Sequence, residues 1–488
     1  MSSLETESRT TALKRDSLGL PSVLAVSLSF ISPTIGAIFV TALIVGQAGA
    51  SAPFVFGMGA VALTLNAMTF AQFARRVPSS GILYSSVAKG IGPSTGLVQG
   101  LVLLVVYGVV SVANICLFGG FVADVLKRRA SLDVPWWLLS LAIIAVIAVL
   151  AWLSVSASMR FDLLLLAFEV VVVGALFIVI VVQGGADGQI PGAVGPTLSP
   201  SGFSGLGLGF VYVALAYFGF ESCTTVAEEA RDTRRSIPFA LIGSVVLSGV
   251  FFVFASYAVL VGFGATHLDA LTGSSAPVSD LAGRYIGTWY EVFIDIAAVS
   301  AITAVLLSMQ NGNFRIWHAL AREQVLPRLF AKVHAKHQTP TAAIIGFSIV
   351  SAIGAVVAGS TWGPLESWGY LGYFCGLGIL PIYLLPNLAL MRFMWTRHRD
   401  EFNWLTHGVF PGLSSLIMVV ALVFTIYPRP EGPARLMPFI LLAVAVAAIV
   451  WVMVLRRTDA ERIDQVGASL FVEGNPDRDD AGAVAVRS

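Results

Sequence analysis

The stretch AYFGFESCTTVAEEARDTRRSIP, residues 216–238, contains a carboxyl group inside an apolar segment and then ends in a dense group of charges. Glu221 lies two positions after Gly219, which stands between two phenylalanines. Glycine permits main-chain dihedral angles that other residues avoid, so a helix through this segment is expected to be interrupted there. The charged end is expected to leave the apolar region, where Glu228 and Glu229 can pair with the arginines that follow them.

The composition of the whole chain predicts a polytopic membrane protein. Of its 488 residues, 57% are hydrophobic and only 12% are charged, whereas soluble domains carry about a quarter charged residues. The net charge of +1 gives no indication of a nucleic-acid partner. All three cysteines lie in apolar runs, so no disulfide framework is expected. The first 19 residues are polar and lack the apolar core of a cleavable signal peptide.

Twelve apolar runs are candidates for membrane-spanning helices, and most are near the roughly 20 residues that a bilayer helix needs. They cover residues 20–45, 53–74, 94–123, 135–155, 161–183, 207–228, 238–263, 287–310, 341–359, 365–391, 408–427 and 436–455. The sequence therefore predicts a membrane domain over residues 20–455.

The distribution of basic residues predicts the orientation, because lysine and arginine favour the cytoplasmic side of short connections. With the N-terminus inside, all but six of the 29 fall in cytoplasmic segments. The six are Lys127, Arg128, Arg129, Arg284, Arg429 and Arg435. We therefore expect a multi-pass protein of the plasma membrane with both termini cytoplasmic: a short segment over residues 1–19 and a disordered tail over 456–488.

Two of the expected spans contain residues that interrupt helices. SLSFISPTIGAIFV, residues 27–40, carries Ser32-Pro33-Thr34, and ALAYFGFESC, residues 214–223, carries Gly219. A simple kink or a close helix contact could explain either one alone. Two interruptions five helices apart are instead the pattern of a transporter built from inverted repeats. Free N–H groups at one break suit a carboxylate, and free carbonyl groups at the other suit an ammonium group or a small cation.

Three segments together resemble the amino acid–polyamine–organocation (APC) superfamily. FGFESCTTVAEEARDTRRSIPFAL resembles its sixth-helix signature, VPSSGILYSSVAKGIG (77–92) its loop after helix two, and NGNFRIWHALAREQVLPRLFAKVHAKHQTP (311–340) its connection after helix eight. The resemblance implies an all-α LeuT-type fold with a 5+5 inverted repeat, broken helices 1 and 6, and twelve transmembrane helices. The repeats would cover about 20–183 and 207–391, and helices 11 and 12 about 408–455.

The resemblance also implies a substrate site between helices one and six, with helices three, eight and ten as walls. Main-chain N–H groups at the first break would bind a carboxylate, and carbonyl groups at the second would accept from an amine. Leu215 stands where many relatives carry an aromatic gate, and Ala37 stands where the usual pattern has glycine. The predicted substrate-binding residues are Ser32, Pro33, Thr34, Ile35, Gly36, Ala37, Leu215, Ala216, Tyr217, Phe218 and Gly219.

Acidic residues inside the spans are candidates for coupling to an ion, because charges in a bilayer mark functional sites. Glu169 lies where many relatives have a lysine, and burial disfavours its ionised form, so it suits proton coupling. It could equally bind sodium or serve as a neutral structural group. Glu221 could carry a proton or brace the broken helix. Asp295, with Glu291 one turn before it, could line a vestibule or mark a helix end.

No enzyme, cofactor or metal site is expected. GLGLGF, residues 205–210, precedes a membrane helix rather than following a strand, so it does not indicate dinucleotide binding. The histidines lie in loops or at helix ends without further ligands nearby. The predicted function is secondary active transport of a small amino acid or amine across the plasma membrane, coupled to protons through Glu169 or Glu221 as the first choice, with sodium symport left open. A polyamine transporter, an exchanger and a non-transporting nutrient sensor are the alternatives.

Overall fold

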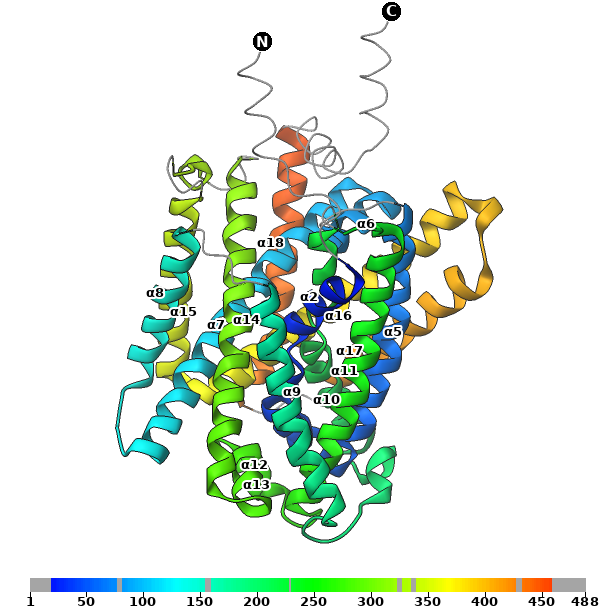
Figure 1. Ribbon diagram of the computed structural model, residues 1–488. Helices are drawn as coiled ribbons and strands as arrows, with labels where there is room; N and C mark the ends of the chain where they lie inside the picture. The colour runs from blue at the N-terminus through cyan, green and yellow to red at the C-terminus, as the bar shows by residue number, and fades with distance from the viewer. Residues whose placement is uncertain are drawn as a thin grey trace, which may run out of the picture.

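The computed structural model describes residues 19–76, 81–153, 159–227, 230–322, 327–334, 339–426 and 432–458 (Figure 1). The predictions for residues 1–18, for Glu228 and Glu229, and for the tail from 459 lie outside the described residues. Within the described ranges the regular structure consists of helices, with no strand. This agrees with a bilayer environment, where helices satisfy main-chain hydrogen bonds within one segment.

The helices follow the apolar runs closely. The first expected span comprises α2 (Leu20–Ile31), α3 (Pro33–Ile35), the π-helix η1 (Gly36–Val40) and α4 (Thr41–Ala48), and the sixth comprises α10 (Gly202–Ala216) and the 3₁₀-helix η5 (Phe220–Val226). The other long helices are α5 (Ala52–Arg76), α7 (Pro93–Ala130), α8 (Trp136–Trp152), α9 (Met159–Val182), α11 (Thr233–Phe263), α14 (Thr288–Arg322), α15 (Thr341–Trp362), α16 (Pro364–Arg397), α17 (Phe410–Ile426) and α18 (Met437–Thr458).

Ten stretches of the described chain are long and apolar enough to cross a membrane. One of them, Leu20–Arg76, contains both of the first two expected spans, and α8 is apolar but shorter. The prediction of an all-α polytopic membrane protein is thus confirmed. The count of twelve spans and the division into two inverted repeats stay predictions.

The two interrupted segments cross each other inside the bundle. α2 packs against η5, while α4 packs against α10, so the first half of each segment meets the second half of the other. α7, α14 and α16 surround this crossing, and α11 packs along both α2 and α5. The arrangement brings residues near 32 and near 219 to the middle of the molecule, far apart in the chain but adjacent in space (Figure 1).

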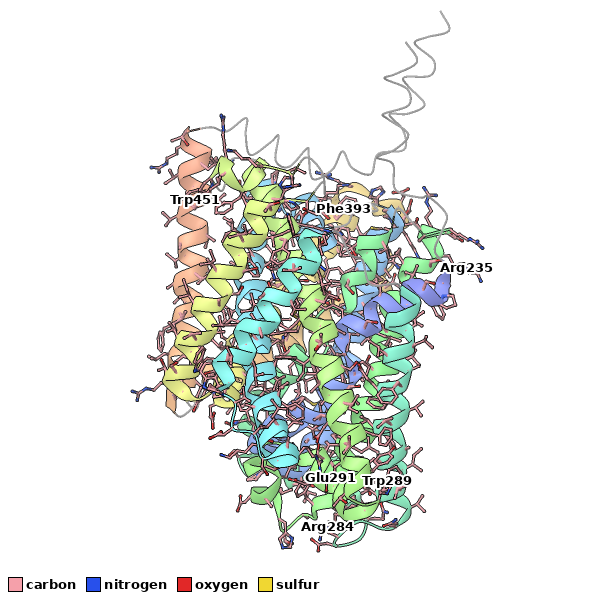
Figure 2. The ribbon with its side chains drawn as sticks, turned by 60° about the vertical axis from the view of Figure 1, so that its left-hand side comes forward. Arg235, Arg284, Trp289, Glu291, Phe393 and Trp451 are labelled. Atoms are coloured by element: carbon pink, nitrogen blue, oxygen red, sulfur yellow. The ribbon has the colours of Figure 1, made fainter. Side chains whose placement is uncertain are left out.

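Short helices cover the two ends of the bundle. α6 (Ile82–Gly90) lies at one end, and α12 (Leu268–Gly273) and α13 (Pro277–Tyr285) lie at the other (Figure 1). Charged side chains lie at both ends: Arg235 at the α6 end, and Arg284 and Glu291 at the α13 end, whereas Phe393 near the α6 end is buried (Figure 2). The middle of the bundle holds the apolar core.

Candidate functional site

The first interruption is produced by Ser32, which takes a left-handed conformation with φ 49° and ψ 80°. Its main-chain N–H still bonds the Leu28 carbonyl at 3.0 Å, so α2 ends there in a regular way. Pro33 then opens the next helical segment, a position where its missing N–H costs little. The π-helix η1 follows at once, and such bulges are frequent at functional sites.

Part of the predicted carboxylate site is already engaged within the chain. The Ser32 hydroxyl accepts a hydrogen bond from the Ile35 N–H at 3.4 Å, and the Gly36 N–H donates to the Ser32 carbonyl at 3.2 Å. The Ser32 hydroxyl keeps its own proton available as a donor. A carboxylate at this point would therefore be held by fewer N–H groups than the sequence predicts, with the Ser32 O–H as a further donor.

The second interruption falls between α10 and η5. Gly219 has φ 97°, which favours glycine, and the Phe30 ring occupies the space that a Cβ atom would need. The Leu215 carbonyl accepts from the Phe218 N–H at 3.2 Å. The carbonyl groups of Ala216 and Phe218 accept no hydrogen bond from the described part of the chain. Two free acceptors thus lie at the end of α10, as binding of an ammonium group would require.

Hydrogen bonds join the two interrupted segments directly. The Ser27 hydroxyl of α2 donates to the Phe220 carbonyl at 2.6 Å and accepts from the Cys223 N–H at 3.3 Å. The Ser222 hydroxyl donates back to the Val26 carbonyl at 3.3 Å. Ser27 could not be predicted from the sequence, because a small polar residue in an apolar helix carries no distinct signal. These bonds hold α2 and η5 together as one unit.

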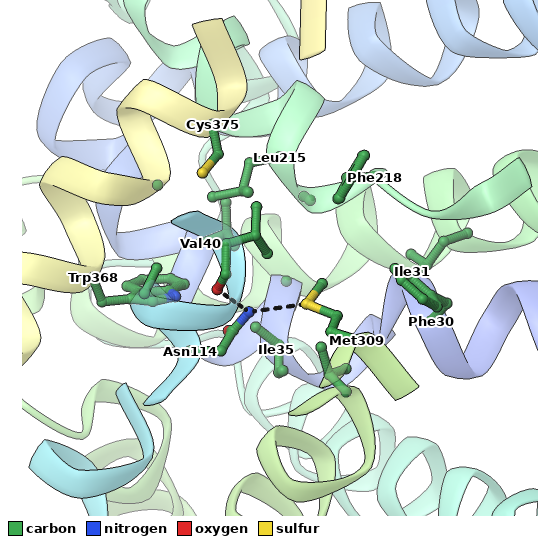
Figure 3. Close-up of a pocket in the computed structure, with 16 residues that line it drawn as sticks. Phe30, Ile31, Ile35, Val40, Asn114, Leu215, Phe218, Met309, Trp368 and Cys375 are labelled. Atoms are coloured by element: carbon green, nitrogen blue, oxygen red, sulfur yellow. Dashed lines mark hydrogen bonds between the residues drawn. The ribbon is translucent and has the colours of Figure 1, made fainter. Parts of the chain in front are cut away.

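A small cavity lies between the interruptions, with a volume of about 40 Å³ (Figure 3). Ile35 and Gly36 line it from the first segment, and Leu215, Ala216 and Phe218 line it from the second. Its other walls come from α7, α14 and α16, the three helices that the sequence predicts as walls. The volume accommodates water but is too small for an amino acid, so substrate binding requires the walls to separate.

Aromatic side chains flank the cavity on both sides of the first interruption. Phe30, which precedes it, packs with Tyr107 and Phe218, whose rings are 4.7 Å apart. Phe39, which follows it, packs with Trp368 at 5.9 Å. Both groups lie next to the small cavity, so the conformation is closed around it.

The remaining predicted binding residues lie close to the cavity without lining it. Ser32, Pro33, Thr34 and Ala37 belong to the buried turn behind Ile35 and Gly36. Tyr217 is fully buried and points the other way: its hydroxyl donates to the Phe56 carbonyl at 3.4 Å, and its ring packs on Phe252 at 5.1 Å. Conversely, Asn114, Met309 and Trp368 line the cavity but were not among the predicted residues.

Glu169 lies on α9 beside the first interruption and is 3% exposed. Ser300 of α14 donates a hydrogen bond to its carboxyl at 2.8 Å. The Thr34 hydroxyl faces the same carboxyl, although it forms no hydrogen bond of good geometry with the described residues. No ion pair to Glu169 is present in the described part of the chain. Three oxygen-bearing side chains from three elements thus meet at one point.

Glu221 has a different environment. The Tyr383 hydroxyl of α16 donates to its carboxyl at 2.9 Å, and the Tyr107 hydroxyl of α7 donates at 3.4 Å. The main-chain N–H groups of Gly219 and of Glu221 itself also face the carboxyl. Like Glu169, it has no ion pair within the described ranges. The carboxyl is held in place by donors from three helical elements.

Asp295 lies far from the interruptions, at the α13 end of α14. It pairs with Arg129 at 2.9 Å and with Arg128 at 3.5 Å, and the Ser279 hydroxyl of α13 donates to it at 2.6 Å. Arg129 also pairs with Glu291 at 2.6 Å. These pairs account for Arg128 and Arg129 at the end of α7, two of the basic residues that stand against the expected charge distribution. The structure therefore does not bring Asp295 together with the other two acids.

The described residues contain no group of three or more histidine, cysteine, aspartate or glutamate side chains that could hold a metal ion. A monovalent cation would need only oxygen ligands, and among the predicted residues Glu169 and Thr34 provide such atoms together with Ser300.

Comparison with known proteins extends these observations over nearly the whole chain. A family model described as amino acid permease matches residues 18–454. The branched-chain amino acid permease BcaP of Bacillus subtilis is 26% identical over 70% of this chain and 74% of its own length. The low-affinity putrescine importer PlaP of Escherichia coli K12 is 22% identical over 80% of this chain and 85% of its own. Cationic amino acid transporter 7 of Arabidopsis thaliana is 26% identical over 83% of this chain and 70% of its own.

Proposed function

The chain belongs to the amino acid permease family and is a membrane transporter for amino acids or amines, and we propose that it moves an amino acid across the plasma membrane by coupling to protons through Glu169. Substrate would bind between the two interruptions, and the walls of the closed cavity would separate alternately towards the two sides. Both termini would face the cytoplasm. The fold would be the LeuT-type inverted repeat.

The observation that carries the coupling proposal is the position of Glu169. Its carboxyl touches Ser300 of α14 and faces Thr34 directly after the Ser32 interruption. An ionised carboxylate can only accept hydrogen bonds, whereas a protonated carboxyl also donates one. A change in protonation therefore alters how α9 and α14 hold the interrupted helix, which is the element that also contacts substrate.

The free groups at the two interruptions support an amino acid substrate. The carbonyl groups of Ala216 and Phe218 would accept from its ammonium group. The Ser32 hydroxyl and the start of the helical segment after it would bind its carboxylate. Both ends of the zwitterion would then contact interrupted helices, so binding would fix the relative position of the two segments.

A second candidate, an amine without a carboxylate, is favoured by the hydrogen bonds of the Ile35 and Gly36 N–H groups to Ser32. Such a substrate would use the carbonyl groups alone. Competition of tracer uptake by putrescine against neutral amino acids separates the two candidates.

Transport by purified protein in liposomes tests the proposal. Labelled amino acid is offered under an inward proton gradient, under an inward sodium gradient, and in counterflow without a gradient. We expect accumulation under the proton gradient. Glu169→Gln should lower that accumulation at least tenfold while counterflow continues, because counterflow does not need the coupling ion.

Glu291→Gln is the matched control, since it makes the same chemical change in an ion pair far from the interruptions. Unchanged proton dependence in Glu169→Gln would remove this residue from coupling. Accumulation driven only by sodium would assign the oxygen cluster to that ion instead. Counterflow alone, without accumulation under either gradient, would indicate an exchanger, and binding without any flux would indicate a nutrient sensor.

A further inference from the structure

Resting on the proposed transport function, we infer that the substrate is an amino acid with an uncharged aliphatic side chain, and that Asn114 and Leu215 determine this specificity. The relatives include transporters named for branched-chain amino acids, for cationic amino acids and for putrescine, so family membership leaves the class open. The residues that line the cavity must determine which substrates are accepted, because they surround the side chain of the bound amino acid.

The wall opposite the interruptions is apolar. Val110 and Ala113 of α7, Val305 of α14 and Cys375 of α16 face the cavity, and none of the described residues that line it has an acidic or basic side chain. A second ammonium group or a guanidinium group in this space would lose its water without gaining a charged partner. That loss is unfavourable for a buried ion. An aliphatic side chain is instead stabilised when it is buried against these apolar groups.

The two buried acids beside the interruptions, Glu169 and Glu221, are not available to a cationic side chain in this conformation. Glu221 is held by Tyr107 and Tyr383, and the Tyr107 ring packs against Phe30 and Phe218 at the edge of the cavity. Glu169 lies behind the first interruption, bonded to Ser300, and neither acid lines the cavity. A diamine or a lysine side chain would have to displace the aromatic group to reach Glu221.

Asn114 is the polar exception in the wall (Figure 3). Its amide nitrogen donates to the Val110 carbonyl at 3.1 Å and to the Met309 sulfur at 3.5 Å. Its amide oxygen accepts no hydrogen bond from the described part of the chain, yet the residue is only 6% exposed. A neutral amide in this position tolerates an aliphatic group, and replacing it by a carboxylate would supply the missing partner for a cation.

Leu215 limits the size of the side chain. It closes the cavity from α10, and Gly372 of α16 provides the space it occupies, because a Cβ atom on Gly372 would lie 2.9 Å from the Leu215 methyl group. Removing three carbons at Leu215 therefore widens the cavity without touching the free carbonyl groups of Ala216 and Phe218.

Counterflow in liposomes tests the inference without depending on the coupling ion. Liposomes with the full chain are loaded with leucine, valine, alanine, phenylalanine, lysine or putrescine, and exchange against labelled leucine and labelled putrescine is measured. Wild type should exchange the aliphatic amino acids and give at least tenfold slower exchange of lysine and putrescine.

In Asn114→Asp, the rate of exchange of lysine or putrescine should rise at least tenfold relative to the rate of exchange of leucine. Asn114→Gln, which keeps the amide, should retain the preference for leucine. Leu215→Ala should shift the preference from valine towards phenylalanine by about tenfold, and it provides an independent readout if Asn114→Asp prevents folding.

The outcomes distinguish failure of the substrate assignment from failure of the proposed transport function. Exchange of putrescine or lysine in preference to leucine by wild type would overturn the substrate class and leave the transport function standing. Unchanged selectivity in correctly folded Asn114→Asp and Leu215→Ala would overturn the assignment of the two residues. Exchange of none of the six compounds would contradict the proposed amino acid transport itself.

Discussion

Glu169 and Glu221 are both buried carboxyl groups without a basic partner within the described ranges, but their surroundings differ. Glu221 accepts hydrogen bonds from two tyrosines and faces two main-chain N–H groups of its own turn. Among the described residues, only Ser300 donates a hydrogen bond of good geometry to Glu169, while the Thr34 hydroxyl faces the same carboxyl. A carboxyl with many fixed donors braces a structure, whereas one with few donors can change its protonation or bind a cation with less disruption.

The strongest test of this difference is stability. Glu221→Ala leaves the Tyr107 and Tyr383 hydroxyls buried without their acceptor, at about 1–3 kcal/mol for each. Glu169→Ala removes the acceptor of Ser300 only, so it should cost less. Thermal unfolding of purified protein measures both, and Glu221→Gln, which keeps one acceptor oxygen, should fall between Glu221→Ala and wild type. A lower melting temperature for Glu169→Ala than for Glu221→Ala would reverse the comparison.

The next test addresses the sensitivity of Glu169. Ser300→Ala removes its one hydrogen-bond donor, and a bond to a charged group contributes about 1.5–3 kcal/mol. We therefore expect the pH profile of uptake to move by about one pH unit or more, since 1.36 kcal/mol corresponds to one unit. Ser300→Thr keeps the hydroxyl and should retain the wild-type profile. Identical profiles for all three proteins would show that this bond plays no part in coupling.

A smaller effect distinguishes the two tyrosines at Glu221. The Tyr383 bond is 2.9 Å long and the Tyr107 bond 3.4 Å, so the shorter one should contribute more. Tyr383→Phe should lower stability by about 1 kcal/mol, and Tyr107→Phe by less. The comparison is made by thermal unfolding under one set of conditions. Equal losses would mean that the two bonds hold Glu221 equally.

The smallest expected effect extends the comparison to a half-buried base outside the membrane spans. Burial, and then the nearby positive charge of Arg397, lower the pKa of Lys89 on α6. The unfolded chain therefore holds this proton to higher pH than the folded one, so the contribution of Lys89 to stability rises with pH between its folded pKa and its ordinary value. Thermal unfolding from pH 7 to 10 should show this rise in wild type and a weaker one in Lys89→Gln. An unchanged slope in the variant would contradict it.

The sequence could predict the elements that a bilayer imposes. Apolar runs become helices because no water is available to satisfy a main-chain group there, and each expected span corresponds to a helix or an interrupted helix. The sequence also pointed to the regions around Ser32 and Gly219, which have positive φ angles. Proline and glycine change the conformation of the main chain at their own positions, so their effect does not depend on distant residues. The acids inside the spans were visible for the same reason, because a charge in an apolar run is rare.

The hydrogen-bond and ion-pair partners of the acidic residues could not be predicted from the sequence. Tyr383 lies 162 residues from Glu221, and Ser300 lies 131 residues from Glu169. Asp295 shows the consequence: an acid in an apolar helix indicated coupling, and its pairs with Arg128 and Arg129 appear only when α7 and α14 are packed together.

By itself, then, the sequence determined the helical membrane fold and the family, because these depend on local composition and main-chain chemistry. The tertiary structure alone decided which carbonyl groups are free, which donors hold each acid, and that Asn114 and Leu215 face the same cavity. Those properties depend on distances between helices that are far apart in the chain, and apolar packing in a bilayer fixes these distances without leaving a pattern in any one segment.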